Sequence, residues 1–117
     1  MISAQAKAKV RLGVSTATLT ELACAMALNP SYVALGPIYT TKSKDSEYDP
    51  RGSKLLRVWR DLLPVSTPLV AIGGVVLGNA QEVLQEGEGC GIAVISAVTA
   101  AQDLPETITA WKRLWNP

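Results

Sequence analysis

Four short apolar runs, each followed by apolar residues at helical spacing, most constrain what this chain can fold into. The runs span residues 10–16, 32–36, 69–74 and 91–96. Strands that are apolar along their length and alternate with helices are typical of a parallel sheet covered by helices. In such sheets ligands bind beyond the carboxyl ends of the strands, and each run here ends in Gly, Ser or Thr. We therefore expect an α/β fold with a ligand site at that edge.

Caps and spacing predict four helices, which begin near Thr18, Ser53, Asn79 and Asp103. The first and last have the capping sequences Thr-Leu-Thr-Glu and Asp-Leu-Pro-Glu, in which the acid three residues after the cap reaches back to the cap amide. The three tryptophans fall at helical spacing, and we interpret them as residues that cover the sheet rather than stack on a ligand.

The chain length of 117 residues fits one domain, with residues 1–9 as an N-terminal extension and residues 10–117 as the folded unit. A closed (β/α)8 barrel needs about 200 residues or more, so this chain is too short to form one. Four parallel strands leave two open edges, and a barrel fragment exposes an apolar face. We expect the chain to form an oligomer, or to belong to a longer protein, or to have a flatter sheet.

Composition excludes several classes of function. The net charge is +1 with acids and bases interspersed, which argues against a nucleic-acid or membrane surface. No apolar run approaches a membrane span, and no secretory signal is present, so we expect a cytoplasmic protein. The absence of histidine excludes His-based triads and imidazole metal sites. Cys24 and Cys90 have no metal-ligand spacing, and we interpret them as buried or semi-buried thiols.

The ends of the third and fourth runs suit a phosphate. Gly73 and Gly74 permit close approach to backbone N–H groups, and Asn79 opens the next helix. The glycine pair alone fits a tight turn equally well. Ser96, at the end of the following run, adds a hydroxyl at the neighbouring position, and the combination favours a phosphate ligand.

The connection from residue 39 to 52 is long and polar, and loops of this kind are usually functional. Its hydroxyl and ammonium groups at 40–44 suit phosphate or diphosphate, although a solvated loop is the alternative. We expect it to close over a ligand. The acids that follow, at 45, 47 and 49, have no convincing Mg²⁺ spacing.

Together these residues resemble the C-terminal half of the thiamine-phosphate synthase (thiamine-phosphate pyrophosphorylase) family. The matching segments are 12–16, 32–39, 70–75 and 92–99, in order and at suitable spacing. The resemblance implies the last four βα units of a (β/α)8 TIM-type barrel. It also implies a transferase of thiamine biosynthesis that joins 4-amino-5-hydroxymethyl-2-methylpyrimidine diphosphate to thiazole phosphate and releases diphosphate.

The same resemblance implies roles for individual residues. The thiazole-phosphate set would be Thr41, Lys42, Ser43, Gly74, Ile95 and Ser96. Lys44 would contact the pyrimidine diphosphate and act catalytically on its departure, with Ser15 as a further contact. Mg²⁺ is the implied cofactor, but its acidic ligands belong to the family's N-terminal half and are not in this chain. The partners implied are small-molecule phosphates, with a second copy or a separate N-terminal half completing the barrel.

The sequence also departs from the family pattern, with Ala17 where the family often has His and Thr40 where it has Pro. Three alternatives stay open. One is a truncated, non-catalytic half-barrel that binds a phosphate ligand or only self-associates. The second is a thiazole tautomerase-like protein, although that branch has His where Pro37 stands. The third is another phosphate-binding barrel fragment, of the indole-glycerol-phosphate kind, against which the segment 36–39 argues.

Overall fold

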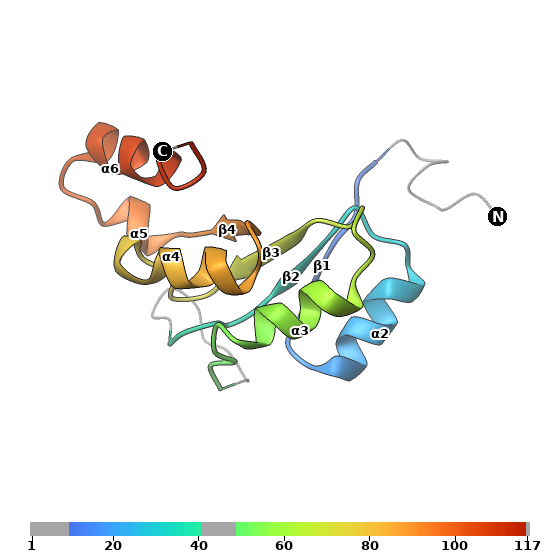
Figure 1. The fold of residues 1–117 in the computed structure, drawn as a ribbon. Coiled ribbons are helices and arrows are strands. Elements are labelled where there is room, and N and C mark those ends of the chain that lie inside the picture. Colours follow the sequence, from blue (N-terminus) through green and yellow to red (C-terminus); the bar gives the residue numbers. More distant parts are fainter. Residues whose placement is uncertain (1–9, 41–48, 117) are drawn as a thin grey trace.

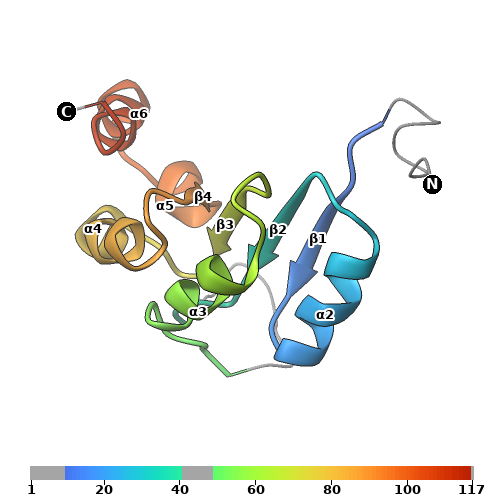
Figure 2. The same cartoon turned by 45° about the vertical axis from the view of Figure 1, so that its right-hand side comes forward.

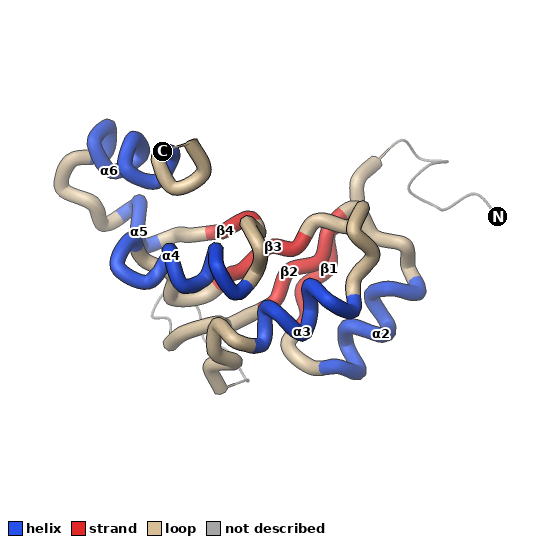
Figure 3. Tube along the Cα trace, in the orientation of Figure 1, coloured by secondary structure: helices blue, strands red, loops and turns tan. Residues whose placement is uncertain are grey.

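The structure is a computed structural model that describes residues 10–40 and 49–116. Its centre is one parallel sheet in the order β1-β2-β3-β4, whose strands lie side by side in Figure 3. The strands are β1 (Gly13–Thr16), β2 (Tyr32–Leu35), β3 (Leu69–Ile72) and β4 (Gly91–Ala93). The helices are α2 (Leu19–Ala27), α3 (Leu55–Leu62), α4 (Leu77–Glu86), α5 (Ser96–Thr99) and α6 (Leu104–Lys112). The predicted parallel sheet with alternating helices is confirmed.

Helices α2, α3 and α4 lie along one side of the sheet (Figure 1), and the second view agrees (Figure 2). Helix α3, which follows β2, contacts β3, whereas α2, which follows β1, contacts β1 itself. The helix-covered face carries the in-register residues Thr16, Leu35 and Ala71, all buried. The opposite face carries Ser15 and Tyr32, which are exposed. The sheet is therefore covered on one face only by the helices described here.

A buried hydrogen-bond chain ties the helix layer to the sheet. The indole Nε1 of Trp59 in α3 donates to Thr16 Oγ1 at 2.8 Å. The Thr16 hydroxyl in turn donates to the Ala34 carbonyl at 2.7 Å. Because all these atoms are buried, each polar group needs its partner, and the chain fixes α3 against both β1 and β2.

The helix starts differ in detail from the sequence predictions. Thr18 caps α2 by accepting from the Glu21 amide at 3.1 Å, but the Glu21 carboxylate reaches back to the Ala17 amide, at 2.7 Å, rather than to the cap residue. Helix α4 begins at Leu77, two residues before the predicted start. Asn79 lies in its first turn and accepts from the Val76 amide at 2.8 Å. Asp103 caps α6 as predicted, accepting from the Glu106 amide at 3.1 Å.

The strands are shorter than the apolar runs. Strand β4 ends at Ala93, and Ser96 opens the four-residue helix α5, which the sequence did not predict. Strand β3 ends at Ile72, because Gly73 and Gly74 have positive φ values of 103° and 69° that leave the extended region. Gly73, Gly74 and Ser96 were expected to end these strands. They instead follow the last strand residue by one, two and three positions, so that expectation is wrong.

Two predictions about single side chains need correction. Cys90 is buried, and desolvation raises the pKa of its thiol. Cys24 is exposed, because Leu22 and Ala25 take the inward positions of α2 and leave residue 24 on its outer side. Trp59 and Trp111 are buried as predicted, whereas Trp115 is partly exposed.

Among the helices of the described ranges, none is long and apolar enough to cross a membrane.

Candidate active site

The carboxyl ends of β2 and β3 continue into two segments that pack tightly on each other. The Ile38 amide donates to the Ile72 carbonyl at 3.0 Å, and the Tyr39 amide donates to the Gly73 carbonyl at 2.9 Å. A Cβ on Gly73 would lie 2.6 Å from Pro37 Cα. The segment after β2, residues 36–40, therefore packs directly against the segment after β3. We call residues 36–40 the β2 tail.

Gly74 is required by the same packing. Its φ of 69° lies in the left-handed region, and a Cβ there would collide with the Thr40 carbonyl oxygen and lie 2.9 Å from Tyr39 Cβ. The glycine pair thus has a structural reason that is independent of any ligand. This is the tight-turn interpretation left open by the sequence, and it leaves the ligand role a prediction.

The residues that follow the 41–48 segment are hydrogen-bonded to the β2 tail, which precedes that segment. After this segment, the Arg51 amide donates to the Pro37 carbonyl at 2.7 Å, and the Gly52 amide donates to the Ile38 carbonyl at 2.9 Å. The predicted site residues at 41–44, namely Thr41, Lys42, Ser43 and Lys44, lie outside the described residues. Their predicted roles stay predictions, as does loop closure over a ligand.

Arg51 brings a positive charge to the carboxyl edge of the sheet, a feature that the sequence reasoning missed. Its Nε donates to the Asp49 carbonyl at 2.9 Å, and its Nη1 lies 3.5 Å from the carbonyl of Ala17, the residue after β1. The guanidinium therefore spans from the long connection to the end of the first strand. The available signal was an arginine at the end of a polar loop whose lysines were predicted to bind the phosphate groups.

Tyr39 links the β2 tail to α4. Its phenol donates to Glu82 Oε2 at 2.6 Å across 43 positions of sequence. Desolvation by burial raises the pKa of Tyr39, the hydrogen bond to Glu82 raises it further, and a hydrogen bond with Ser53 opposes them. The phenol therefore stays protonated and holds the tail against the helix that follows the glycines.

The predicted phosphate residues of the last two strands lie past neighbouring strand ends. Ile72 of β3 pairs with Ala93 of β4, so Gly74 and Ser96 follow adjacent strands at similar depth. The side chains of Ile95 and Ser96 are exposed. At the neighbouring strand end, Asn79 Nδ2 donates a hydrogen bond to the Gly74 carbonyl at 3.3 Å. The first N–H groups of a helix have no partner within it, so the turn at Ser96 adds donors beside its hydroxyl.

Ser15, by contrast, lies on β1, and β2 separates it from the ends of β3 and β4. Its side chain is exposed on the face that the helices leave uncovered. Gly74, Ile95 and Ser96 thus follow adjacent strands, whereas Ser15 lies on a strand that is next to neither β3 nor β4.

The described residues do not fit a resident Mg²⁺ site. Three or more acidic, Cys or His side chains that could share a metal ion occur nowhere within 10–40 and 49–116.

Comparison with known proteins decides the family. A family model described as thiamine monophosphate synthase matches residues 1–98. The chain belongs to this family. It is 48% identical over 103 residues to the thiamine-phosphate synthase of Pectobacterium atrosepticum, covering 87% of this chain and 47% of that protein. It is 38% identical over 115 residues to the thiamine-phosphate synthase of Neisseria meningitidis serogroup A, covering 98% of this chain and 55% of that protein.

The fold comparison gives the same relationship. A solved structure of thiamine phosphate pyrophosphorylase from Pyrococcus furiosus matches with a TM-score of 0.77 and 31% identity, covering 91% of this chain and 48% of that chain. The family member described here therefore spans about half the length of the relatives it matches.

Proposed function

We propose that this chain supplies the thiazole-phosphate half of a thiamine-phosphate synthase site. The reaction would couple a hydroxymethylpyrimidine diphosphate to thiazole phosphate. Membership of the family over residues 1–98 is the observation that carries the proposal. The Gly74 and Ser96 positions past adjacent strand ends support it, because phosphates commonly bind between the loops after two neighbouring strands of such folds.

In the proposed subsite, thiazole phosphate is bound by backbone N–H groups near Gly74 and at the start of α5, and by the Ser96 hydroxyl. Hydrogen bonds from several donors to one anion are each stronger than neutral ones, and they fix its orientation. The neighbouring loop would complete the subsite with Thr41, Lys42 and Ser43.

In the proposed site, Lys44 and Ser15 bind the diphosphate group. We add Arg51 to this set. In the proposed reaction the C–O bond to diphosphate breaks, the bonding electrons leave with the diphosphate, and the thiazole nitrogen forms a bond to the resulting pyrimidine-methyl cation. A fixed ammonium or guanidinium stabilises the charge that develops on the leaving group, which is catalysis without proton transfer. A site that lacks histidine is compatible with this chemistry.

The proposed site needs a complement, since this chain spans 47–55% of its curated relatives. We propose that the sheet is half of a (β/α)8 barrel, completed by a second copy or by a separate N-terminal half that would carry the Mg²⁺ ligands. The tautomerase alternative is not favoured, because the relatives named here are synthases. The alternative that the test below distinguishes is a non-catalytic half-barrel that binds the phosphate ligand.

The test is formation of thiamine phosphate by the purified chain with both substrates and Mg²⁺, compared with Lys44→Ala. Lys54→Ala is the matched control, because Lys54 is an exposed lysine just before α3. The proposal expects product from wild type and from the control, and at least about tenfold less from Lys44→Ala. Equal product from both variants would refute the role of Lys44, and no product from wild type that still binds thiazole phosphate would favour the non-catalytic half-barrel.

A further inference from the structure

The turn after β3 contains two adjacent glycines whose peptide groups need outside contacts to fix their direction. Gly73 and Gly74 have positive φ values of 103° and 69°. Glycine adopts positive and negative φ about equally readily, so a glycine pair by itself permits more than one orientation of the peptide groups that it joins. The contacts that neighbouring segments make with this turn therefore select the orientation.

The first two carbonyl groups of the turn are held by the β2 tail. The Ile38 amide donates to the Ile72 carbonyl at 3.0 Å, and the Tyr39 amide donates to the Gly73 carbonyl at 2.9 Å. In a planar trans peptide the C=O and N–H groups point in opposite directions. The N–H of Gly74 therefore points away from the β2 tail, and β4 is the neighbour of β3 on that side of the sheet.

The next peptide group, between Gly74 and Val75, is held by the side chain of Asn79. Asn79 Nδ2 donates to the Gly74 carbonyl at 3.3 Å, and Asn79 Oδ1 accepts from the Val76 amide at 2.8 Å. The reversed side-chain amide would set oxygen against oxygen and N–H against N–H, so these two bonds also fix its own orientation. The Val75 N–H, on the other side of the peptide, therefore points away from Asn79.

The two bonding patterns leave adjacent N–H groups free to bind a ligand. The carbonyl groups of residues 72–74 all accept hydrogen bonds, whereas the amides of Gly74 and Val75 have no acceptor within residues 10–40 and 49–116. Successive backbone N–H groups in a turn form a concavity of the kind that binds anions. A flip of the Gly74–Val75 peptide would replace the second N–H by a carbonyl oxygen, which repels an anion.

We infer that Asn79 is a positioning residue of the proposed thiazole-phosphate subsite. It holds the Gly74–Val75 peptide so that the Val75 N–H faces the phosphate group beside the N–H of Gly74. Asn79 acts through that peptide and not by contact with the ligand. The inference rests on the proposed function, which supplies the phosphate, and it deepens that function by naming what makes the subsite select the phosphate form.

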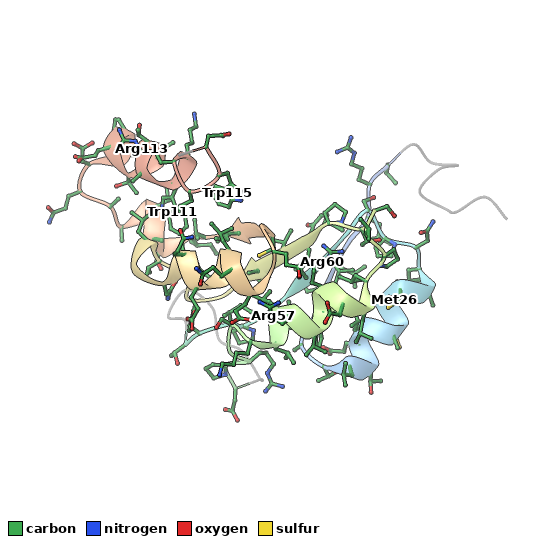
Figure 4. The ribbon with its side chains drawn as sticks, viewed as in Figure 1. Met26, Arg57, Arg60, Trp111, Arg113 and Trp115 are labelled. Atoms are coloured by element: carbon green, nitrogen blue, oxygen red, sulfur yellow. The ribbon has the colours of Figure 1, made fainter. Side chains whose placement is uncertain are left out.

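Helix α4 has other contacts that keep it in place. Its inner face is buried through Ala80, Val83 and Leu84. Near its other end, Arg57 Nε of α3 lies 3.1 Å from Glu86 Oε2, and Figure 4 shows Arg57 where α3 approaches α4. An Asn79 variant should therefore retain the helix. Arg57→Ala is a control that loosens the same helix without touching the turn.

The test is a calorimetric titration of the full chain with thiazole phosphate and with the corresponding thiazole alcohol, for wild type, Asn79→Ala and Asn79→Asp. The readout is the ratio of the two affinities, because a variant that only destabilises the fold lowers both affinities by the same factor. Wild type should prefer the phosphate form by about tenfold or more, and this ratio should fall by about tenfold in both variants. Asn79→Asp keeps the acceptor for the Val76 amide, so it should stay folded, and it lacks the donor to the Gly74 carbonyl.

A charge control completes the design. Gln81→Glu makes the same exchange of amide for carboxylate at an exposed position of α4. It and Arg57→Ala should both keep the wild-type ratio, and a fall in either control as large as that in Asn79→Ala would overturn the inference. A ratio that is unchanged in Asn79→Ala, or that falls in only one of the two Asn79 variants, would also overturn it and leave the proposed function standing. Equal affinity of wild type for the two ligands would refute the proposed function and the inference together.

Discussion

Replacing Gly74 by alanine tests whether the β2 tail depends on close packing against the glycine pair. Gly74 has a φ of 69°, and the added Cβ would press on the Thr40 carbonyl and on Tyr39 Cβ. Gly89→Ala is the matched control, because Gly89 has a φ of 77° and nothing within 4 Å of its Cβ position. The two variants share the backbone penalty and the loss of unfolded-state freedom, and differ only in the steric contact.

The expected magnitudes follow from that difference. Left-handed backbone with a Cβ costs about 1–2 kcal/mol, which both variants incur. Forcing an extra methyl group into packed surroundings adds about 1–3 kcal/mol in Gly74→Ala alone. The free energy of unfolding should therefore fall by about 1–2 kcal/mol in the control and by about 2–5 kcal/mol in Gly74→Ala.

Urea unfolding followed by tryptophan fluorescence measures both values, with Trp59 in the core as the reporter. In thermal unfolding the extra loss corresponds to a midpoint lower by roughly 4–12 °C than that of the control. Equal losses in the two variants would refute the reasoning, because the β2 tail would then not rest on residue 74.

Three further predictions concern single side chains. Thr16→Val should lower the free energy of unfolding in urea by about 1–3 kcal/mol, because it leaves the buried indole N–H of Trp59 without its acceptor. Thr16→Ser should retain most of the stability, and equal losses in the two variants would contradict the hydrogen-bond chain. The pKa of Tyr39 is raised above 10.0, so its bond to Glu82 stabilises the fold below pH 10 and this contribution is lost as pH rises through the folded-state pKa. The stability difference between wild type and Tyr39→Phe should thus shrink above pH 10, and parallel pH profiles would argue against it. A thiol reagent should label Cys24 rapidly and Cys90 only on unfolding, so Cys24→Ser should abolish the fast phase; a fast phase that survives would mean Cys90 is accessible.

The strands and the main helices could be predicted because each depends on local signals. Apolar runs marked the strands, and the caps at Thr18 and Asp103 marked two helix starts where their side chains accept the expected amides. Asn79 was recognised as belonging to a helix start, but its side chain bonds backward to Val76, so the helix begins earlier than the residue suggests.

Features set by contacts between distant segments were not predictable. Helix α5 begins at the end of an apolar run that resembles a continuous strand, and it contacts α6. The packing of Thr40 on Gly74 joins residues 34 positions apart, and a glycine pair does not say which segment will approach it. The same holds for Arg51, whose reach to Ala17 depends on how the long connection returns to the sheet.

The measurement that tests the central claim most directly is a calorimetric titration of the chain with thiazole phosphate and with the corresponding thiazole alcohol. The account predicts that the phosphate form binds at least about tenfold more tightly, since one charged hydrogen bond is worth about 1.5–3 kcal/mol. Ser96→Ala should weaken that preference, while Ser66→Ala, at an exposed serine in the turn before β3, should not. Equal affinity for the two ligands would contradict the account.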